Sequence, residues 1–218
     1  NDFEYWDAVA SVREAYRAAT KLEFSGDKDS VSKAHIVEVF EAFAEKIEKG
    51  IEKAVEIGNG LVPTYFTHEA VDFEPVVDEN GEPVISHYGL QKAKVKAFKA
   101  VPLPYFLEGP ARMMGYVDVD TARDMFDKVK KTDLYDKKLA MYKTSASIEG
   151  CSMENGRCRA FTPGWQEREN VFLHMEYKYI LAMLKAGLYD EYYDTITRAL
   201  IPFLDPNMYG RSTLENSS

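Results

Sequence analysis

Apolar residues recur at intervals of three and four positions along much of this chain, and this spacing restricts the fold more than any other feature. One such pattern runs from Glu4 to about Leu22, and a longer one runs from Ser32 to Gly58-Asn59-Gly60. Because a helix turns once every 3.6 residues, these intervals place the apolar side chains on one face. Two amphipathic helices are therefore predicted, marked by Tyr5, Val9, Val12, Tyr16 and Ala19, and by Ile36, Phe40, Phe43, Ile47, Ile51 and Val55.

Helical spacing returns in the second half of the chain. Helices are predicted over 104–114, 121–130, 171–186 and 190–203, with another turn or two between Leu134 and Tyr142. Gly115 and Gly187 lie between neighbouring predicted helices, where a glycine commonly ends one helix and allows the next to begin. The second half therefore reads as a series of αα-hairpins.

The segment from Leu61 to Lys99 differs from the rest. It is rich in β-branched and aromatic residues around the turn signal Asp78-Glu79-Asn80-Gly81, with Pro75 and Pro83 on either side. These residues indicate a short β-hairpin or an extended insertion near 61–99.

The whole pattern predicts an all-α fold, since strands and helices do not alternate. We expect a partial (α/α)6 toroid built of αα-hairpins and interrupted by the insertion. The chain has no fixed-period repeat of the kind that builds a solenoid. It begins with Asn1 and ends in the polar string 211–218. We interpret 1–218 as a single domain that is a fragment of a larger catalytic domain.

Charge and hydropathy exclude several partners. The net charge of −9 is spread over mixed-sign helical faces, which argues against a nucleic-acid partner. No apolar run approaches the roughly 18 to 20 residues that a membrane span requires, and no signal peptide is visible. A cytoplasmic location without membrane association is expected.

The cysteines and most histidines give no sign of a metal site. Cys151 and Cys158 flank Asn155-Gly156, a dipeptide that favours a tight turn. A hairpin there could bring the sulfurs close, but two thiols without a paired histidine cannot complete a four-ligand zinc site. We interpret them as two unremarkable cysteines whose redox state stays open. His35, His68 and His87 are interpreted as ordinary polar residues.

The segment Pro163–His174 combines a turn, an aromatic ring, carboxylates, a cation and an imidazole. Asn170 is a plausible N-cap for the following helix, which places His174 about one turn inside and allows Glu167 to approach the same pocket. Free N–H groups at a helix N-terminus attract anions, and Arg168 would strengthen such a site. The alternative is structural: His174 packs against a neighbouring helix, and Arg168 pairs with a nearby glutamate in solvent.

The same segment resembles a known family. Pro163-Gly164, Glu167, Val171-Phe172 and His174 are similar to the Pro-Gly-x-x-Glu-x-x-x-(Ile/Val)-Phe-x-His segment of the cellobiose phosphorylase-like family, the inverting glycoside phosphorylases of glycoside hydrolase family 94. In that family the segment lies in an (α/α)6 barrel. The similarity covers roughly residues 90 to 205.

The resemblance implies a site and a reaction. Glu167 would contact a sugar hydroxyl, and His174 would bind phosphate. Trp165 and Arg168, which lie outside the matched positions, are further candidates for substrate binding. No cofactor or metal is implied, and inorganic phosphate is a co-substrate. The product would be a sugar 1-phosphate, formed from a β-linked di- or oligosaccharide with inversion. The expected partners are the oligosaccharide, phosphate and the rest of the parent polypeptide, and a homodimer stays an open alternative.

The sequence departs from the family at the general acid. The family's Asp-Trp-Asn-Asp motif is absent, and Asp7 in Tyr5-Trp6-Asp7 is the nearest approach. Glu108, beside aromatic residues and a turn, is a second weak candidate. Where the family has Asn-Gly-Gly, this chain has Arg168-Glu169-Asn170. An inverting glycoside hydrolase and a non-catalytic domain that binds glycans or a protein therefore stay open as alternatives.

Overall fold

The structure of the chain is a computed structural model that describes residues 2–209. Asn1 and the polar string 211–218, on which the interpretation as a fragment rests, lie outside the described residues. The described part forms two compact units. Unit 1 contains the residues up to Ala44 together with Thr67–Val101, and unit 2 contains Glu45–Phe66 together with the residues from Pro102 onwards. Whether both belong to one larger domain stays a prediction.

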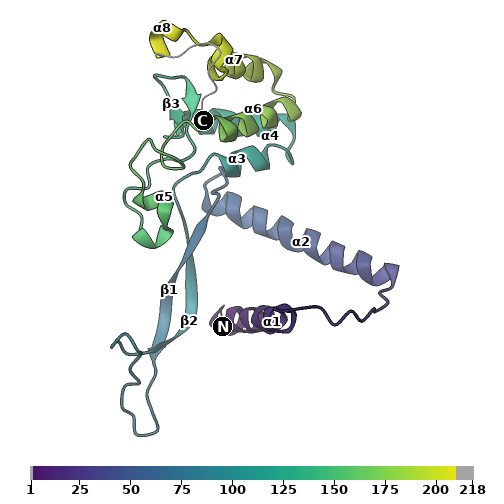
Figure 1. The fold of residues 1–218 in the computed structure, drawn as a ribbon, viewed down its shortest axis with the longest axis vertical. Helices are drawn as coiled ribbons and strands as arrows, with labels where there is room; N and C mark the ends of the chain where they lie inside the picture. The colour runs from purple at the N-terminus through teal and green to yellow at the C-terminus, as the bar shows by residue number, and fades with distance from the viewer. Residues whose placement is uncertain (1, 210–218) are drawn as a thin grey trace. The chain divides into compact units, whose positions relative to one another are not determined.

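A long β-hairpin dominates unit 1 (Figure 1). Strands β1 (Phe66–Pro75) and β2 (Ala93–Pro102) pair along their length. At the far end the Val76 N–H donates to the Lys92 carbonyl at 2.8 Å, and at the near end the Leu103 N–H donates to the Tyr65 carbonyl at 3.0 Å. The strands are therefore antiparallel.

Two β-turns form the tip of this hairpin. The Gly81 N–H donates to the Asp78 carbonyl at 3.1 Å, and the Gly89 N–H donates to the Ser86 carbonyl at 3.0 Å. Both glycines have positive φ, 82° and 78°, a conformation that glycine adopts without a steric cost. The predicted turn at Asp78–Gly81 is confirmed, whereas the second turn was not predicted.

The first two helices agree with the sequence patterns. Helix α1 is Asp2–Thr20 and α2 is Lys33–Ile57, and α2 ends at Gly58-Asn59-Gly60 as expected. There the Gly60 N–H donates to the Val55 carbonyl at 2.8 Å with φ of 86° at Gly60, which is a left-handed helix end. Asp2 is a helical residue, and its carboxylate accepts a hydrogen bond from the Phe98 N–H at 3.0 Å.

The prediction of an all-α fold and a partial (α/α)6 toroid is wrong. Strands β1 and β2 are ten residues each, so the segment interpreted as a short insertion is a major element. Helices α1 and α2 bury no residue, although a toroid requires paired helices that bury a face against one another. The described structure has a mixed α and β character. Helical periodicity revealed the amphipathic faces, but it carried no information about what covers them.

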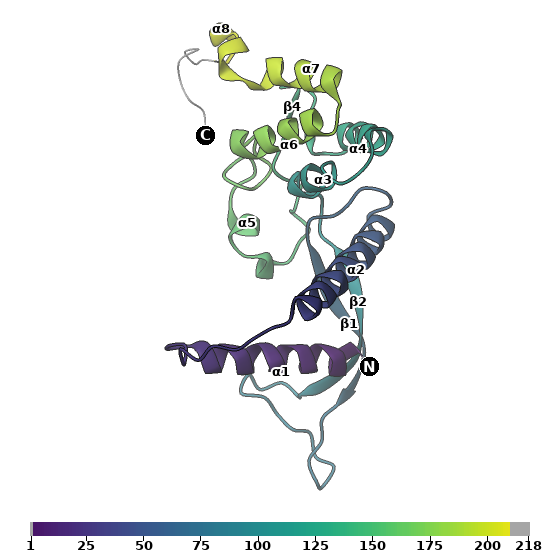
Figure 2. The same ribbon diagram turned by 90° about the vertical axis from the view of Figure 1, so that its right-hand side faces the viewer.

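The core lies in unit 2, among the helices α3 (Glu108–Met113), α4 (Val119–Lys131), α6 (Leu173–Lys185) and α7 (Tyr189–Ala199). Helix α6 packs against both α3 and α7 (Figure 2). The largest fully buried side chains belong to Tyr142, Tyr179, Leu107, Met114, Leu134 and Met183. The predicted pair of helices around Gly187 is confirmed, and φ at Gly187 is 83°.

One predicted helical segment is a strand pair instead. Residues 134–142 form β3 (Tyr135–Asp136) and β4 (Met141–Tyr142), which are antiparallel. The Asp136 carboxylate accepts the Lys138 and Leu139 N–H groups at 2.8 and 3.0 Å. These two local hydrogen bonds stabilise a turn that reverses the chain, and such side-chain bonds to the backbone compete with helix formation.

Short elements complete the described chain: η1 (Met153–Asn155), α5 (Arg157–Ala160), η2 (Ile201–Phe203) and α8 (Pro206–Tyr209). Cys151 and Cys158 flank η1 and the start of α5, and both are free thiols. Between residues 2 and 209, no helix combines the length and the apolar character needed to cross a membrane.

The close approach of α3 to residues 62–64 gives a stability prediction. A Cβ on Gly109 would lie 2.7 Å from the Val62 carbonyl oxygen and 2.8 Å from Thr64 Oγ1. Gly109→Ala should therefore lower the free energy of unfolding by about 1–3 kcal/mol, measured by urea denaturation. Gly115→Ala is the control, because its Cβ would meet nothing nearer than 3.6 Å. Equal stability of the two variants would contradict this packing.

Candidate functional site

The segment Pro163–Asn170 is a tightly folded loop. The Gly164 N–H donates to the Arg168 carbonyl at 2.8 Å, and the Arg168 N–H donates to the Trp165 carbonyl at 3.1 Å. Trp165 and Arg168 therefore face each other across a short reversal of the chain. This geometry fixes the backbone from which Glu167 projects.

The loop contains three residues in the left-handed region. Gly164 has φ of 86°, while Gln166 and Glu169 have φ of 53° and 55°. Glycine tolerates this conformation, but for a residue with a side chain it is uncommon and persists only where the surroundings hold it. Such positions cluster at functional sites, so the loop is a candidate on backbone geometry alone.

The guanidinium of Arg168 holds the loop in place. Arg168 is 3% exposed, and its Nη1 donates to the carbonyls of Arg159 and Phe161 at 2.8 and 2.7 Å. Its Nη2 is paired with the carboxylate of Glu149, and its Nε lies 3.5 Å from Glu169 Oε1. The arginine proposed for substrate contact thus faces protein atoms. It does pair with a nearby glutamate, Glu149, but only the guanidinium of this pair is buried, because the Glu149 side chain is 68% exposed.

The Glu149 carboxylate forms ion pairs with two arginines, Arg159 and Arg168. The hydrogen bond from Arg168 is the main cause that lowers the pKa of Glu149, and the charges of Arg159 and Arg168 add to it. Arg159 also pairs with Glu149 at 3.0 Å and donates to the Cys151 carbonyl. Glu149 therefore stays ionised and joins the loop to the segment before η1.

A second set of bonds attaches the other side of the loop. Thr144 Oγ1 donates to the carbonyls of Glu167 and Asn170, both at 3.1 Å. The Glu169 N–H donates to Ser145 Oγ at 3.0 Å. Because the Thr144 carbonyl accepts the Leu107 N–H at 2.9 Å, the loop is tied through this residue to the start of α3.

Three predicted site residues remain accessible on this framework. Trp165 is 55% exposed, and its ring meets Phe161 edge-on at 4.9 Å between centroids. Glu167 is partly exposed; its Oε1 pairs with Arg157 at 2.6 Å, while Oε2 is shielded from solvent without a hydrogen-bond partner. His174 is exposed and lies against the edge of Phe172.

Helix α6 begins later than predicted. Its N-cap is Phe172 rather than Asn170, and the helix starts at Leu173, so His174 lies in the first turn. The Asn170 carbonyl instead accepts hydrogen bonds from Thr144. No side chain caps this helix, which leaves N–H groups of the first turn without the usual partner.

The two candidates for the general acid lie in different units. Asp7 is an exposed residue of α1 in unit 1. Glu108 is the first residue of α3 in unit 2, where its Oε1 pairs with Arg112 at 3.0 Å. Glu108 lines a cavity of about 410 Å³ together with Thr64, Tyr65 and Tyr116. Burial, followed by the charges of Glu108 and Cys158, raises the pKa of Tyr65, so all three groups are close.

The structure also contains a buried acid that sequence reasoning missed. Glu176 in α6 is 0% exposed; its Oε1 accepts the Tyr142 N–H at 2.8 Å, and its Oε2 has no partner among the described atoms. Burial raises its pKa from the ordinary 4.5 to about 7. Its position among Leu173, Tyr179 and Ile180 was the only available signal, because a helix face that buries these residues also buries Glu176.

Two further observations bear on the function of this loop: the search for metal-binding groups and the comparisons with known proteins. In the residues that the structure describes, no group of three or more His, Cys, Asp or Glu side chains is arranged to hold a metal ion. The chain matches no family model, no curated protein and no solved structure. The family resemblance of Pro163–His174 therefore stays a prediction that rests on the residues of this chain.

We call the bonds from Arg168 to the carbonyls of Arg159 and Phe161 and to the Glu149 carboxylate the Arg168 clamp. If the clamp holds the loop, replacing Arg168 should cost more stability than replacing the nearby Arg157. Arg168→Lys keeps the charge but cannot reach both carbonyls and the carboxylate, so the free energy of unfolding should fall by about 2–4 kcal/mol. Arg157→Lys changes an exposed pair and should alter it by less than about 1 kcal/mol. Urea denaturation of both variants measures the difference, and a similar effect for both would refute the clamp.

The raised pKa of Glu176 predicts that the stability of the fold depends on pH. A carboxyl group whose pKa is higher in the folded state binds more protons there, so stability should fall as the pH rises from about 4.5 to about 7. Glu176→Gln should remove that slope and gain up to roughly 3 kcal/mol above pH 7.5. The measurement is urea denaturation between pH 4.5 and 8. The exposed Glu154→Gln should leave the slope intact, and an unchanged slope in Glu176→Gln would contradict the assignment.

Proposed function

We propose that this chain is the carbohydrate-active part of an inverting glycoside phosphorylase, which cleaves a β-linked di- or oligosaccharide with inorganic phosphate to give a sugar 1-phosphate. The loop that carries Glu167, followed by the exposed His174, is the observation that supports the proposal. The residues of Pro163–His174 resemble the family segment, and Arg168 holds this loop rigidly.

Inverting phosphorolysis requires few catalytic groups from the protein. In an inverting phosphorolysis the phosphate attacks the anomeric carbon, so the enzyme needs one general acid for the leaving oxygen and no base to activate water. A rigid framework that positions the sugar and the phosphate then lowers the entropic part of the barrier.

Glu167 is suited to hold a sugar hydroxyl. Its Oε2 has no hydrogen-bond partner, while Oε1 is held by Arg157. A shielded acceptor without a donor is costly, and a sugar hydroxyl would satisfy it once the carboxylate turns Oε2 toward the surface. The exposed ring of Trp165, on the same turn, offers an apolar face to a sugar ring.

His174 is suited to hold phosphate. It lies in the first turn of α6, where the helix has no side-chain cap and the positive end of the helix dipole favours an anion. The exposed imidazole can donate to a phosphate oxygen. Within unit 2, Glu108 is the candidate general acid, because it lines a cavity beside Tyr65 and Thr64.

Ion pairing of the carboxylates favours a second function, a non-catalytic domain that binds glycans. Glu167 pairs with Arg157, Glu149 with Arg168 and Glu108 with Arg112. A carboxylate oxygen that a guanidinium already holds is not free to approach the leaving oxygen of a glycosidic bond. In this alternative the loop binds sugar without cleaving it.

Ligand titrations of the purified chain test the proposal. Inorganic phosphate should shift the NMR signals of the His174 ring, and His174→Ala should weaken phosphate binding at least about tenfold. His68→Ala is the matched control, because His68 is also exposed and also meets a phenylalanine edge. Glu167→Gln should weaken binding of a β-linked disaccharide without altering phosphate binding.

The outcomes separate the two functions. Binding of both ligands, with release of sugar 1-phosphate, supports the phosphorylase. Disaccharide binding that is independent of phosphate and without cleavage supports the binding domain. Release of free sugar in phosphate-free buffer, or equal phosphate binding by the wild type and His174→Ala, would contradict the phosphorylase.

A further inference from the structure

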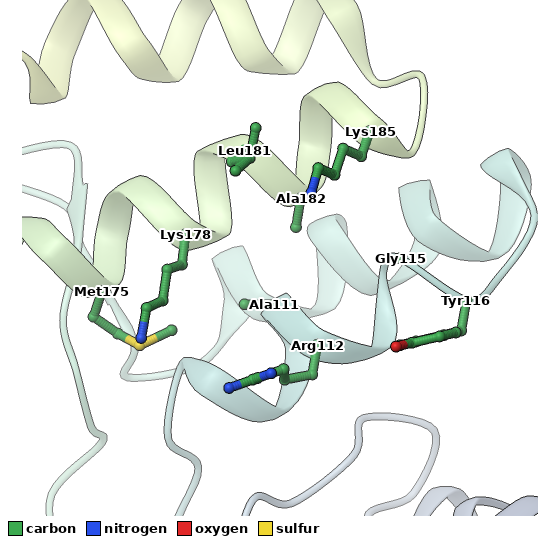
Figure 3. Close-up of a pocket in the computed structure, with 9 residues that line it drawn as sticks. All are labelled: Ala111, Arg112, Gly115, Tyr116, Met175, Lys178, Leu181, Ala182 and Lys185. Atoms are coloured by element: carbon green, nitrogen blue, oxygen red, sulfur yellow. The ribbon is translucent and has the colours of Figure 1, made fainter.

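A groove between α3 and α6 carries a local charge opposite to that of the whole chain. Its volume is about 450 Å³, and the residues that line it are Ala111, Arg112, Gly115, Tyr116, Met175, Lys178, Leu181, Ala182 and Lys185 (Figure 3). Three of these are cationic and none is acidic, although the net charge of the chain is −9. A groove that gathers only cations on an acidic protein points to an anionic ligand.

The cations come from both sides of the groove. Lys178 and Lys185 belong to α6, and Arg112 belongs to α3. The two lysines are seven positions apart in the helix, which places their backbone positions on the order of 10 Å apart along the axis. Figure 3 shows the side chains of Lys178 and Lys185 leaving α6 at different places along the helix. The groove thus has two separate positive positions.

These cations are available. Lys178 and Lys185 are exposed and form no ion pair with a described residue. Arg112 donates Nε and Nη2 to Glu108 Oε1 at 3.3 and 3.0 Å, which leaves its Nη1 free of the carboxylate. The free nitrogen is a donor suited to a phosphate oxygen.

The floor between the cations is apolar. Ala111 and Ala182 contribute small side chains, and Met175 is 7% exposed. At the end of the groove opposite Met175, the ring of Tyr116 is 84% exposed (Figure 3). An apolar floor with an aromatic ring and two cationic ends suits a ligand with a compact carbon body between two anionic groups.

We propose that the α3/α6 groove binds a small organic bisphosphate of the phosphorylated-sugar class, with one phosphate group at Lys178 and Arg112 and the other at Lys185. The volume lies in the range of small-molecule sites, roughly 300–1,000 Å³. The acidic charge of the whole chain disfavours a long polyanion. His174 does not line this groove, so the proposal does not rest on the phosphate position proposed at His174.

Calorimetric titration of the chain with a hexose 1,6-bisphosphate tests the proposal. The wild type should bind it, and the double variant Lys178→Gln/Lys185→Gln should bind at least about tenfold more weakly. The control Lys137→Gln/Lys138→Gln removes the same charge from the exposed turn between β3 and β4 and should leave the affinity unchanged. His174→Ala should also leave it unchanged, which distinguishes this site from the one at His174.

A second variant and a second ligand sharpen the result. Leu181→Glu puts a carboxylate into the groove at a position that is already 46% exposed, so the chain should fold normally and lose binding. Inorganic phosphate should bind more weakly than the bisphosphate, because it can occupy one position only. Absence of binding, equal loss in the control variant, or equal affinity for the two ligands would overturn the proposal.

Discussion

The buried guanidinium of Arg168 is the interaction on which the candidate site depends. It connects the carbonyls of Arg159 and Phe161 to the Glu149 carboxylate, and so ties the loop Pro163–Asn170 to the chain before it. A planar guanidinium with donors in a fixed fork suits this task, whereas a lysine could not reach all three acceptors. The strained conformations of Gln166 and Glu169 persist because this cation and Thr144 hold the loop from both sides.

The Arg168 clamp gives the charged residues of the loop different roles. From the sequence, Arg168 and Glu167 read as a similar pair of polar side chains. In the structure Arg168 faces the interior, whereas Glu167 is partly exposed, with one oxygen paired to Arg157 and the other shielded from solvent without a partner. Arg168 therefore holds the backbone of the loop, whereas Glu167 is available for a ligand. The family resemblance assigns a sugar contact to Glu167.

Local patterns predicted the local structure well. The glycine-rich end of α2, the helices on either side of Gly187 and the turn at Asp78–Gly81 all follow from residues within a few positions of one another. Long-range arrangements were not predictable in this way. The β1–β2 pairing joins residues that are up to 38 positions apart, as between Tyr65 and Leu103, and the burial of Arg168 and Glu176 depends on which faces meet. The toroid failed for that reason, because periodicity shows that a helix has an apolar face but not what covers it.

We propose that the clamped loop and the first turn of α6 form one site for a sugar and phosphate. A crystal structure of the chain grown with inorganic phosphate and a β-linked disaccharide tests it most directly. The account predicts phosphate at the His174 imidazole and the N–H groups of the first turn of α6, with a sugar hydroxyl on Glu167. Phosphate and sugar bound elsewhere, with Glu167 and His174 free of ligand, would contradict it.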